Sequence, residues 1–278
     1  MRKLYWFFKL TRPQNNLITA LSVFVGAKVA GDIESWEKVI FACVSAFFIS
    51  AGGNSINDFF DLEIDRINKP YRPLPQGEVS VSSVLPFSFF LFLLGIFLSF
   101  WVRSISIILA FLASGLLILY SSRLKRTLLW GNLTVSFASA LAFIYGGIAT
   151  EDFRLSLIPA AFAFLFHLGR EILKDVEDIK GDSFFNTSTL PIKLGFDFSL
   201  GICTYVFSFL IVLTALPYLL HIFSFLYLLI VIFGVDLIIV YVIWSMWYNQ
   251  SSSNLHRLSN ILKMDMLLGL AAIYAGKF

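Results

Sequence analysis

Charged residues and cysteine are both scarce in this sequence. Only 14% of its 278 residues are charged, whereas a soluble domain carries about 25%. The two cysteines, Cys43 and Cys203, lie inside apolar runs, and the three histidines form no ligand set. Neither a disulfide framework nor a cysteine or histidine metal site is therefore expected. A net charge of +3 is too small to indicate a nucleic-acid partner, and no obligate protein partner is implied.

Hydrophobic residues are abundant instead. They make up 58% of the chain, and the mean hydropathy is +0.81. A domain folded in water could not bury so large an apolar fraction, so the sequence predicts a polytopic membrane protein surrounded by membrane lipids. Because strands with open edges are excluded from hydrocarbon, the predicted fold class is all-α. Residues 1–278 are predicted to form a single transmembrane domain.

Nine apolar runs are candidates for crossing a bilayer, which takes about 20 residues in a helix. The first and the last are the weakest candidates, because they are shorter or more polar than the others. The predicted spans cover residues 13–30, 38–57, 83–102, 104–121, 131–150, 155–174, 197–217, 221–246 and 259–276.

The basic residues are distributed unevenly between the loops. With the N-terminus placed in the cytoplasm, sixteen of the 21 basic residues fall on the cytoplasmic side. Cytoplasmic loops of membrane proteins carry such an excess. We therefore expect a multi-pass protein of the cell membrane with a cytoplasmic N-terminus and, after nine spans, an external C-terminus. The five basic residues on or towards the other side are Lys28, Lys38, Arg103, Arg154 and Lys277.

Two polar regions, at about 54–82 and 171–196, carry acidic clusters with the same spacing of four, three and four residues. At 100° per residue, each cluster occupies an arc of about 60° on one helix face. Stacked carboxylates repel one another, and near a membrane they normally mark a site. All-oxygen clusters suit a hard divalent cation such as Mg²⁺. The clusters are Asn54, Asp58, Asp61 and Asp65, and Glu171, Asp175, Asp178 and Asp182.

Basic and polar residues follow the first cluster or lie at the same depth. Arg72 offers a planar fork to phosphate oxygens, and Lys69 offers a point charge. Beside two clusters of the kind that binds metal, these cations indicate anion binding rather than membrane topology alone. The other candidates for substrate binding are Arg12, Asn16, Asn54, Asn57, Tyr120, Arg123, Lys125 and Glu171.

These motifs resemble those of the UbiA superfamily of intramembrane prenyltransferases. The NDxxDxxxD pattern that begins at Asn57 and the DxxxD pattern that begins at Asp178 match the two acidic motifs of that family, and residues 68–77 resemble its continuation. Within the family, residues 174–182 and 12–16 look most like the archaeal members that make ether lipids. The likeness extends over nearly the whole chain.

The resemblance implies a bundle of nine helices around a central cavity that opens to the cytoplasmic side. An isoprenyl diphosphate is expected to bind with its head between the clusters, through Mg²⁺, and with its tail in a lipid-facing tunnel. The implied catalytic residues and magnesium ligands are Asp58, Asp61, Asp65, Asp175, Asp178 and Asp182. The family often shows YxxxK after the fourth span, but here Tyr120 is followed by Arg123 and Lys125 at offsets of three and five, so the corresponding cation stays open.

Three functions are compatible with the sequence. The favoured one is transfer of a geranylgeranyl group to the free hydroxyl of 3-O-geranylgeranylglyceryl 1-phosphate, the second ether bond of archaeal membrane lipids. This lipid-phosphate acceptor needs cations of its own, for which Arg12, Arg123 and Lys125 are the candidates. The alternative is an aromatic acceptor such as 4-hydroxybenzoate, dihydroxynaphthoate, homogentisate or a haem precursor. A cation transporter is a remote third, because polar residues, Asp236 and Asp265 excepted, collect at the cytoplasmic ends of the spans.

Overall fold

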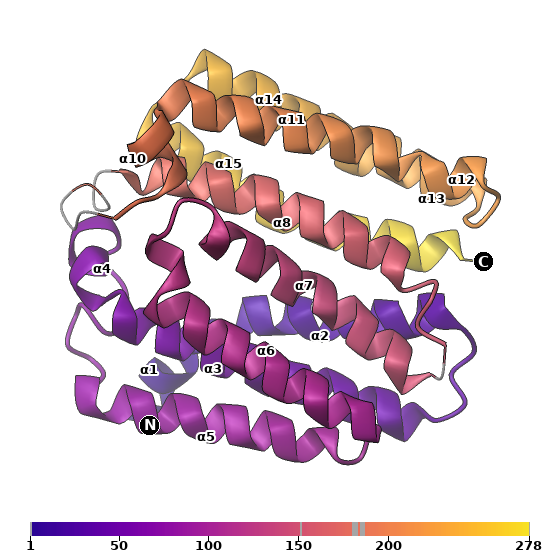
Figure 1. Ribbon diagram of the computed structural model, residues 1–278, viewed down its shortest axis with the longest axis horizontal. Coiled ribbons are helices and arrows are strands. Elements are labelled where there is room, and N and C mark those ends of the chain that lie inside the picture. Colours follow the sequence, from indigo (N-terminus) through magenta and orange to yellow (C-terminus); the bar gives the residue numbers. More distant parts are fainter. Residues whose placement is uncertain (1, 151, 180–182, 184–186, 278) are drawn as a thin grey trace.

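The computed structural model describes residues 2–150, 152–179, 183 and 187–277, and the predicted site residue Asp182 lies outside this set. The described residues contain helices and no strand, which confirms the all-α prediction (Figure 1). The elements are α1 (Arg2–Leu10), α2 (Pro13–Ala30), α3 (Trp36–Phe60), α4 (Leu62–Asn68), α5 (Val81–Ser99), α6 (Ser104–Ser122), η1 (Leu124–Arg126), α7 (Trp130–Ala149), α8 (Leu157–Glu177), α10 (Leu190–Leu194), α11 (Phe196–Thr214), α12 (Leu216–Leu219), α13 (Phe225–Ile230), η2 (Val231–Asp236), α14 (Leu237–Tyr248) and α15 (Ser252–Gly276).

Seven helical segments of the described chain are long and apolar enough to cross a membrane. They comprise α3, α5, α6, α7, α11 with α12, α13 with α14, and α15. Helices α2 and α8 coincide with the first and sixth predicted spans but are not among the seven, so the count of nine stays a prediction. Both helices carry polar side chains along the side that borders an internal cavity, which lowers their hydropathy.

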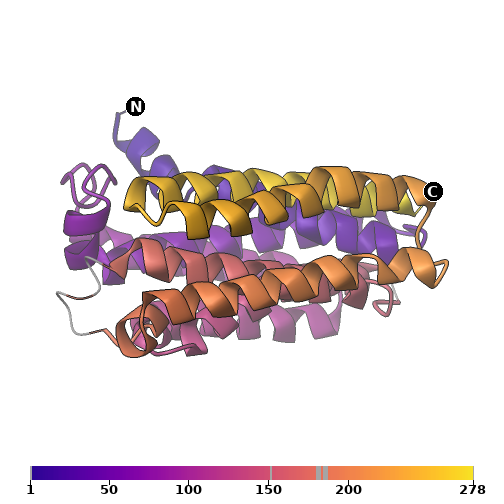
Figure 2. The ribbon, with the colours of Figure 1, turned by 90° about the horizontal axis from the view of Figure 1, so that it is seen from above.

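The long helices run side by side in a layered bundle, as two perpendicular views show (Figure 1, Figure 2). Helix α3 packs against α2, α5 and α6, and α7 packs against α2, α6 and α8. Helix α8 in turn packs against α11 and α15. Helices α2, α7 and α8 are therefore central, with α5, α11 and α14 towards the outside.

Two glycines bring α2 and α7 into backbone contact. A Cβ atom at Gly26 would lie 2.2 Å from the carbonyl oxygen of Phe143, and one at Gly146 would lie 1.8 Å from the carbonyl oxygen of Val23. Neither position has room for a side chain, and small residues of this kind permit close packing of membrane helices. This crossing fixes one wall of the internal cavity.

Large apolar side chains cover the outside of the bundle. Phe90 and Leu93 on α5, Phe111 on α6 and Trp244 on α14 are 60%, 63%, 59% and 59% exposed, respectively. Such extensive apolar exposure marks a surface that contacts lipid rather than water. The predicted multi-pass membrane protein is consistent with this surface and with the seven apolar helices.

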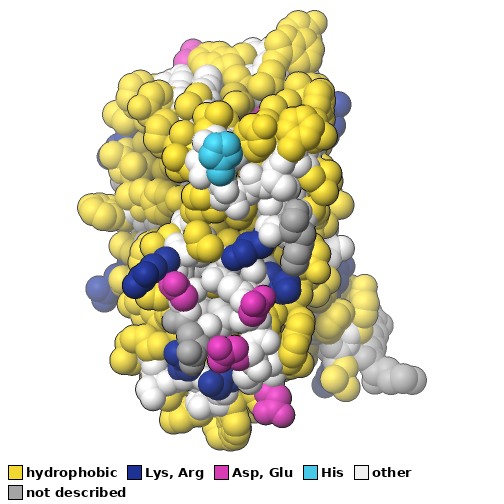
Figure 3. All heavy atoms as spheres, turned by 90° about the vertical axis from the view of Figure 1, so that its right-hand side faces the viewer, with side chains coloured by type: hydrophobic (Ala, Val, Ile, Leu, Met, Phe, Trp, Pro, Cys, Tyr) yellow, Lys and Arg dark blue, Asp and Glu magenta, His cyan; other side chains and the backbone are white. Residues whose placement is uncertain are grey.

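The two ends of the bundle carry different segments. Elements α1, α4, η1 and α10 gather at one end, and the C-terminus lies at the other (Figure 1). The segments predicted to be cytoplasmic therefore share one end. At the end that carries the C-terminus, acidic and basic side chains lie together within a mainly hydrophobic surface (Figure 3).

Candidate active site

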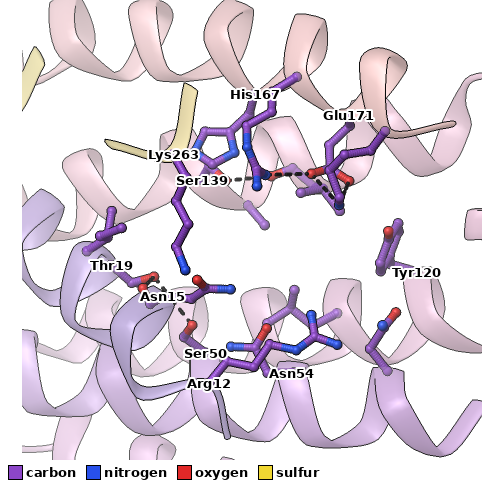
Figure 4. Close-up of a pocket in the computed structure, with 18 of the residues that line it drawn as sticks. Arg12, Asn15, Thr19, Ser50, Asn54, Tyr120, Ser139, His167, Glu171 and Lys263 are labelled. Carbon is purple, nitrogen blue, oxygen red and sulfur yellow. Dashed lines mark hydrogen bonds and ion pairs between the residues drawn. The ribbon is translucent and has the colours of Figure 1, made fainter. Parts of the chain in front are cut away.

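A cavity of about 580 Å³ lies between α2, α3, α6, α7, α8 and α15. Charged and amide side chains line the part near α4, and several of them point into it (Figure 4). Towards the other end of the bundle the lining is mainly small or apolar. The cavity thus joins a polar compartment to an apolar one. The apolar lining includes Ala46, Ile49, Leu109, Ala113, Leu141 and Phe143.

The first acidic cluster lies at the end of α3 and in α4. Asp58, Asp61 and Asp65 are only 2%, 2% and 3% exposed, so their charges need partners. Asp58 accepts a hydrogen bond from Arg12 and another, of 3.2 Å, from Arg72. Asp65 also accepts a hydrogen bond from Arg72. Cations from two other segments therefore neutralise this cluster.

Asp61 interrupts the helix that carries the cluster. Helix α3 ends at Phe60 and α4 begins at Leu62, with Asp61 between them. The Asp61 carboxylate accepts a hydrogen bond from Lys125 and one of 2.7 Å from the side-chain amide of Asn57. Burial alone would raise the pKa of Asp61, but the ammonium of Lys125 holds it below its ordinary value. Asp61 is therefore ionised in the folded protein.

This interruption changes the geometry expected for the cluster. Asp58 borders the cavity, whereas Asp61 and Asp65 do not. These two carboxylates instead contact Lys125 and Arg72, respectively, and both of those cations line the cavity. Burial raises the pKa of Asp65, helped by the charges of Asp61 and Asp58 and opposed by Arg72. A bound divalent cation would be the largest local charge and would favour the ionised form of all three.

The described members of the second acidic cluster lie along one face of α8 and at its C-terminal end. Glu171, Asp175 and Asp178 all border the cavity, as their spacing predicts. Asp175 accepts a 2.8 Å hydrogen bond from Asn132 of α7. Asp178 accepts one of 2.6 Å from Lys69, which follows the first cluster in the chain. The loop after the first cluster therefore contacts the second.

Amide side chains join α2 to α3 beside the first cluster. The Oδ1 atom of Asn16 accepts hydrogen bonds of 3.0 Å from Ser50 and 2.9 Å from Asn54, and its Nδ2 donates one of 2.9 Å to the carbonyl of Thr11. Asn16 is fully buried and does not line the cavity, whereas Asn15 and Asn54 do (Figure 4). Asn16 therefore positions Asn54, and the structure gives no support to its direct contact with a substrate.

The segment after α6 places one cation at the cavity and another outside it. Lys125 borders the cavity with Tyr120, because the short 3₁₀ turn Leu124–Arg126 directs it inward. Burial opposes the charge of Lys125, but Asp61 raises its pKa, so it stays an ammonium. Arg123 is exposed and is not a lining residue. Of the two alternatives left open by the sequence, the geometry selects Lys125, and the expected substrate contact of Arg123 is not supported.

Sequence reasoning missed a group of basic residues on α8 and α15. Glu171 accepts hydrogen bonds of 2.9 and 2.8 Å from Lys174 and one of 3.3 Å from Arg170. Lys263 points into the cavity from α15 (Figure 4). In the sequence these residues signal only cytoplasmic topology. Helical spacing could have placed Arg170 and Lys174 on the face of Asp178, but no local signal identifies Lys263.

The donor atoms of the acidic clusters are compatible with magnesium. No group of three or more carboxylate, imidazole or thiolate side chains encloses a metal position within the part of the chain that the structure describes. Mg²⁺ does not need one, since it typically takes one or two carboxylates and completes its shell with water and substrate phosphates. The Oδ1 atom of Asn57 is buried with no hydrogen-bond partner among the described residues. It leaves one further oxygen available near Asp58 and Asp61.

The sequence matches the UbiA prenyltransferase family over residues 17–267. The digeranylgeranylglyceryl phosphate synthase of Methanosphaera stadtmanae is 36% identical over 97% of this chain and 98% of its own. The enzyme of that name from Methanothermobacter thermautotrophicus is 34% identical over 97% of this chain and 95% of its own. The enzyme of that name from Sulfurisphaera tokodaii is 38% identical over 85% of this chain and 86% of its own.

Solved structures have the same fold. A digeranylgeranylglyceryl phosphate synthase structure matches with a TM-score of 0.78 and 32% identity, covering 100% of this chain and 99% of that one. An apo UbiA homolog from Aeropyrum pernix K1 matches with a TM-score of 0.82 and 16% identity over 94% and 97%. A UbiA homolog from Archaeoglobus fulgidus, bound to DMAPP and Mg²⁺, matches with a TM-score of 0.72 and 18% identity, covering 96% of this chain and 98% of that one. The last two likenesses concern the fold alone.

Proposed function

The chain belongs to the UbiA prenyltransferase family, and from this premise we propose that it transfers a geranylgeranyl group from geranylgeranyl diphosphate to the free hydroxyl of 3-O-geranylgeranylglyceryl 1-phosphate. The bond between the allylic carbon and the diphosphate oxygen breaks, and an ether bond to the acceptor oxygen forms. Diphosphate and the hydroxyl proton are released. Relatives named digeranylgeranylglyceryl phosphate synthase, at 34% to 38% identity, support this acceptor.

The shape and chemistry of the cavity carry this proposal. At one end it is bordered by an aspartate region, which we define as Asp58, Asp61, Asp65, Asp175 and Asp178 with the cations that contact them. Further in, it is lined by apolar side chains. A diphosphate head with an isoprenyl tail needs both environments, charged at one end and hydrocarbon-like at the other.

The aspartate region is the proposed magnesium site. Mg²⁺ bound there would neutralise negative charge on the departing diphosphate. The carboxylates supply its oxygen ligands, and Asn57 supplies a further oxygen. Asp182 joins the set because its motif matches the family, although it lies outside the described residues. The proposed ligands are therefore Asp58, Asp61, Asp65, Asp175, Asp178 and Asp182.

Four cations around the aspartate region are proposed to bind the diphosphate oxygens. Arg12, Lys69, Arg72 and Lys125 are each held by an aspartate, so their positions are fixed before substrate arrives. Arginine forks and lysine ammonium groups both make charge-assisted hydrogen bonds to phosphate oxygens. Groups preorganised in this way stabilise the charge that develops on the leaving group without reorganising during the reaction.

The inner part of the cavity is proposed to hold the tail and protect the reacting carbon. Its apolar lining excludes water, which would otherwise capture an allylic cation. Tyr120 borders the cavity on the side of Lys125, and its ring face is suited to a neighbouring positive charge. Phe143 and Tyr145 border the cavity farther along α7 and offer further aromatic surface.

We propose that α2 and α8 also cross the bilayer, giving nine spans with the N-terminus in the cytoplasm and the C-terminus outside. Helix α2 has 18 residues and α8 has 21, close to the length that a bilayer requires, and both pack inside the bundle. The end with α1, α4 and η1 then faces the cytoplasm, where water-soluble metal ions and diphosphate exchange. Residues 1–278 act as one transmembrane domain, and the cavity opens on that side.

A transport function has less support. Along a transport path, polar groups would continue through the bundle, but the described lining of the cavity turns apolar away from α4. Asp236, a buried carboxylate in η2, accepts hydrogen bonds of 3.2 and 3.4 Å from Thr214. It therefore has the role of an interior hydrogen-bond partner.

The test is a panel of acceptors. Purified protein is incubated with geranylgeranyl diphosphate, Mg²⁺ and either 3-O-geranylgeranylglyceryl 1-phosphate or one of the aromatic acceptors, and products are identified by mass spectrometry. We expect digeranylgeranylglyceryl phosphate as the main product. Preferential prenylation of 4-hydroxybenzoate or a naphthoate would replace the proposed acceptor with an aromatic one.

A further inference from the structure

Among the described residues, two cations that line the cavity have no acidic partner. Lys9 is exposed and lies over the ring of Trp6, which leaves Lys263 as the one that is partly buried. Arg12, Lys69, Arg72 and Lys125 each pair with an aspartate of the aspartate region, and Arg170 and Lys174 pair with Glu171. Lys263 is half-buried in the cavity wall. Within the described residues it donates one 3.2 Å hydrogen bond, to the neutral side chain of Gln14, and contacts no carboxylate.

Other cations border the cavity beside Lys263. Arg170 and Arg12 line the same cavity as Lys263, and a partly buried cation with cationic neighbours is unfavourable unless an anion joins it. Arg170 also donates a 3.4 Å hydrogen bond to the carbonyl of Ser259, which lies one turn before Lys263 on α15. That bond brings the two helices together at this level, so both basic side chains serve the same part of the cavity.

The charge balance distinguishes this part of the cavity from the aspartate region. We call Arg170, Lys174 and Lys263 the cation region. It holds three positive charges against the single carboxylate of Glu171. Five aspartates in the aspartate region instead face four cations. The excess positive charge of the cation region favours an anion, and the excess negative charge of the aspartate region favours a metal ion.

The distance between the two regions suits an acceptor whose phosphate lies close to its reacting hydroxyl. Arg170 and Asp178 share the cavity face of α8, eight residues and hence about 12 Å apart along the helix axis. Arg170 and Asp175 are about 7.5 Å apart on the same measure. In a glyceryl phosphate acceptor the reacting hydroxyl and the phosphate sit on adjacent carbons. When that hydroxyl approaches the diphosphate-bearing carbon, its phosphate lies within one or two helical turns of the aspartate region.

We infer that the cation region is a subsite for the phosphate monoester of the acceptor, with Lys263 as its main contact and Arg170 beside it. This inference rests on the proposed function. It replaces Arg12, Arg123 and Lys125 in that role, because two of these are engaged by aspartates and the third lies outside the cavity. The subsite selects for an acceptor that carries a phosphate.

The experiment compares acceptors with and without that phosphate. Wild type and Lys263→Met are assayed with geranylgeranyl diphosphate, Mg²⁺ and either 3-O-geranylgeranylglyceryl 1-phosphate or phosphate-free 3-O-geranylgeranylglycerol. Losing one charge-assisted hydrogen bond should raise KM for the phosphate acceptor roughly tenfold to a hundredfold. KM for the phosphate-free acceptor and for the prenyl diphosphate should not change. Lys193→Met removes an exposed charge outside the cavity and serves as the matched control.

A binding measurement keeps this inference separate from the proposed function. Calorimetric titration with 3-O-hexylglyceryl 1-phosphate needs no turnover, and its Kd should rise in Lys263→Met and, less steeply, in Arg170→Lys, which keeps the charge but loses the guanidinium fork. If wild type prenylates no glyceryl phosphate, the proposed function is wrong and the titration alone decides the subsite. If both variants keep the wild-type Kd, the cation region does not bind the phosphate, whatever the acceptor proves to be.

Discussion

The aspartate region and the cation region border the same cavity but differ in how their charges are balanced. In the aspartate region each carboxylate of the first cluster holds a lysine or arginine, and Asn132 and Lys69 hold the second. In the cation region Arg170 and Lys174 share Glu171, and Lys263 has no acidic partner among the described residues.

This difference suggests that the two regions of the cavity bind different groups, the aspartate region a metal-bound diphosphate and the cation region a phosphate without metal. A region rich in buried carboxylates gains most from a divalent metal and, through it, a diphosphate. A region with excess positive charge gains most from a plain anion that needs no metal. Two phosphate-bearing lipids can thus be told apart by charge, so that the donor and the acceptor do not exchange places.

Metal removal should have the largest effect, because only the aspartate region is expected to need it. In EDTA, prenyl transfer should fall below detection, and excess Mg²⁺ should restore it. Calorimetric binding of 3-O-hexylglyceryl 1-phosphate should be unaffected by EDTA. Full turnover without metal would remove the proposed distinction between the regions.

Replacing one carboxylate should come next. Asp61→Asn removes a charge but little volume, and kcat should fall about a thousandfold or more, because the leaving group loses its metal-based neutralisation. Glu63→Gln, an exposed acidic neighbour paired with Arg66, is the control and should keep wild-type activity. Thermal unfolding of the detergent-solubilised variant distinguishes loss of chemistry from loss of fold. An Asp61→Asn enzyme with near-normal kcat would contradict the metal role.

The two cations after α6 provide a narrower test of the aspartate region. Lys125→Met should lower kcat/KM for the prenyl diphosphate on the order of a hundredfold, since a positioned cation on a departing diphosphate is lost. Arg123→Met, with its exposed position two residues away, should behave as wild type. Steady-state kinetics on both variants decides the assignment. Equal effects would mean that the turn Leu124–Arg126 does not select between them.

The smallest effect is expected at Asn132, which holds Asp175 through a 2.8 Å hydrogen bond. Asn132→Ala should weaken magnesium activation about tenfold, as is typical when a residue that orients a metal ligand is lost. The Mg²⁺ concentration for half-maximal activity measures this change, and KM for the acceptor should stay constant. A shift in acceptor KM instead would connect Asn132 with the cation region.

Much of this architecture is predictable from the sequence. Apolar runs of bilayer length locate the helices, because their backbone groups must be satisfied within each segment. The helical period places Asp175 and Asp178 on one face, and the prediction holds in α8, which is regular through Glu177. It fits the first cluster less well, because the helix is interrupted at Asp61.

The remaining features depend on packing between segments that are distant in the chain. Whether Arg123 or Lys125 enters the cavity depends on one 3₁₀ turn. The buried role of Asn16 depends on where α3 places Ser50 and Asn54. Lys263 has no motif around it, and its relation to Arg170 exists only because α15 packs against α8. No periodicity within one helix carries this information.

The most direct test of the central claim is the position of the metal. Crystals grown with Mn²⁺ in place of Mg²⁺ and with a slow-reacting thiolo analogue of geranylgeranyl diphosphate would locate the metal by its anomalous signal. We predict a peak in the aspartate region, within about 2.1 Å of carboxylate oxygens and of the analogue's phosphate oxygens. A peak in the cation region, or a bound analogue without metal in the aspartate region, would contradict the account.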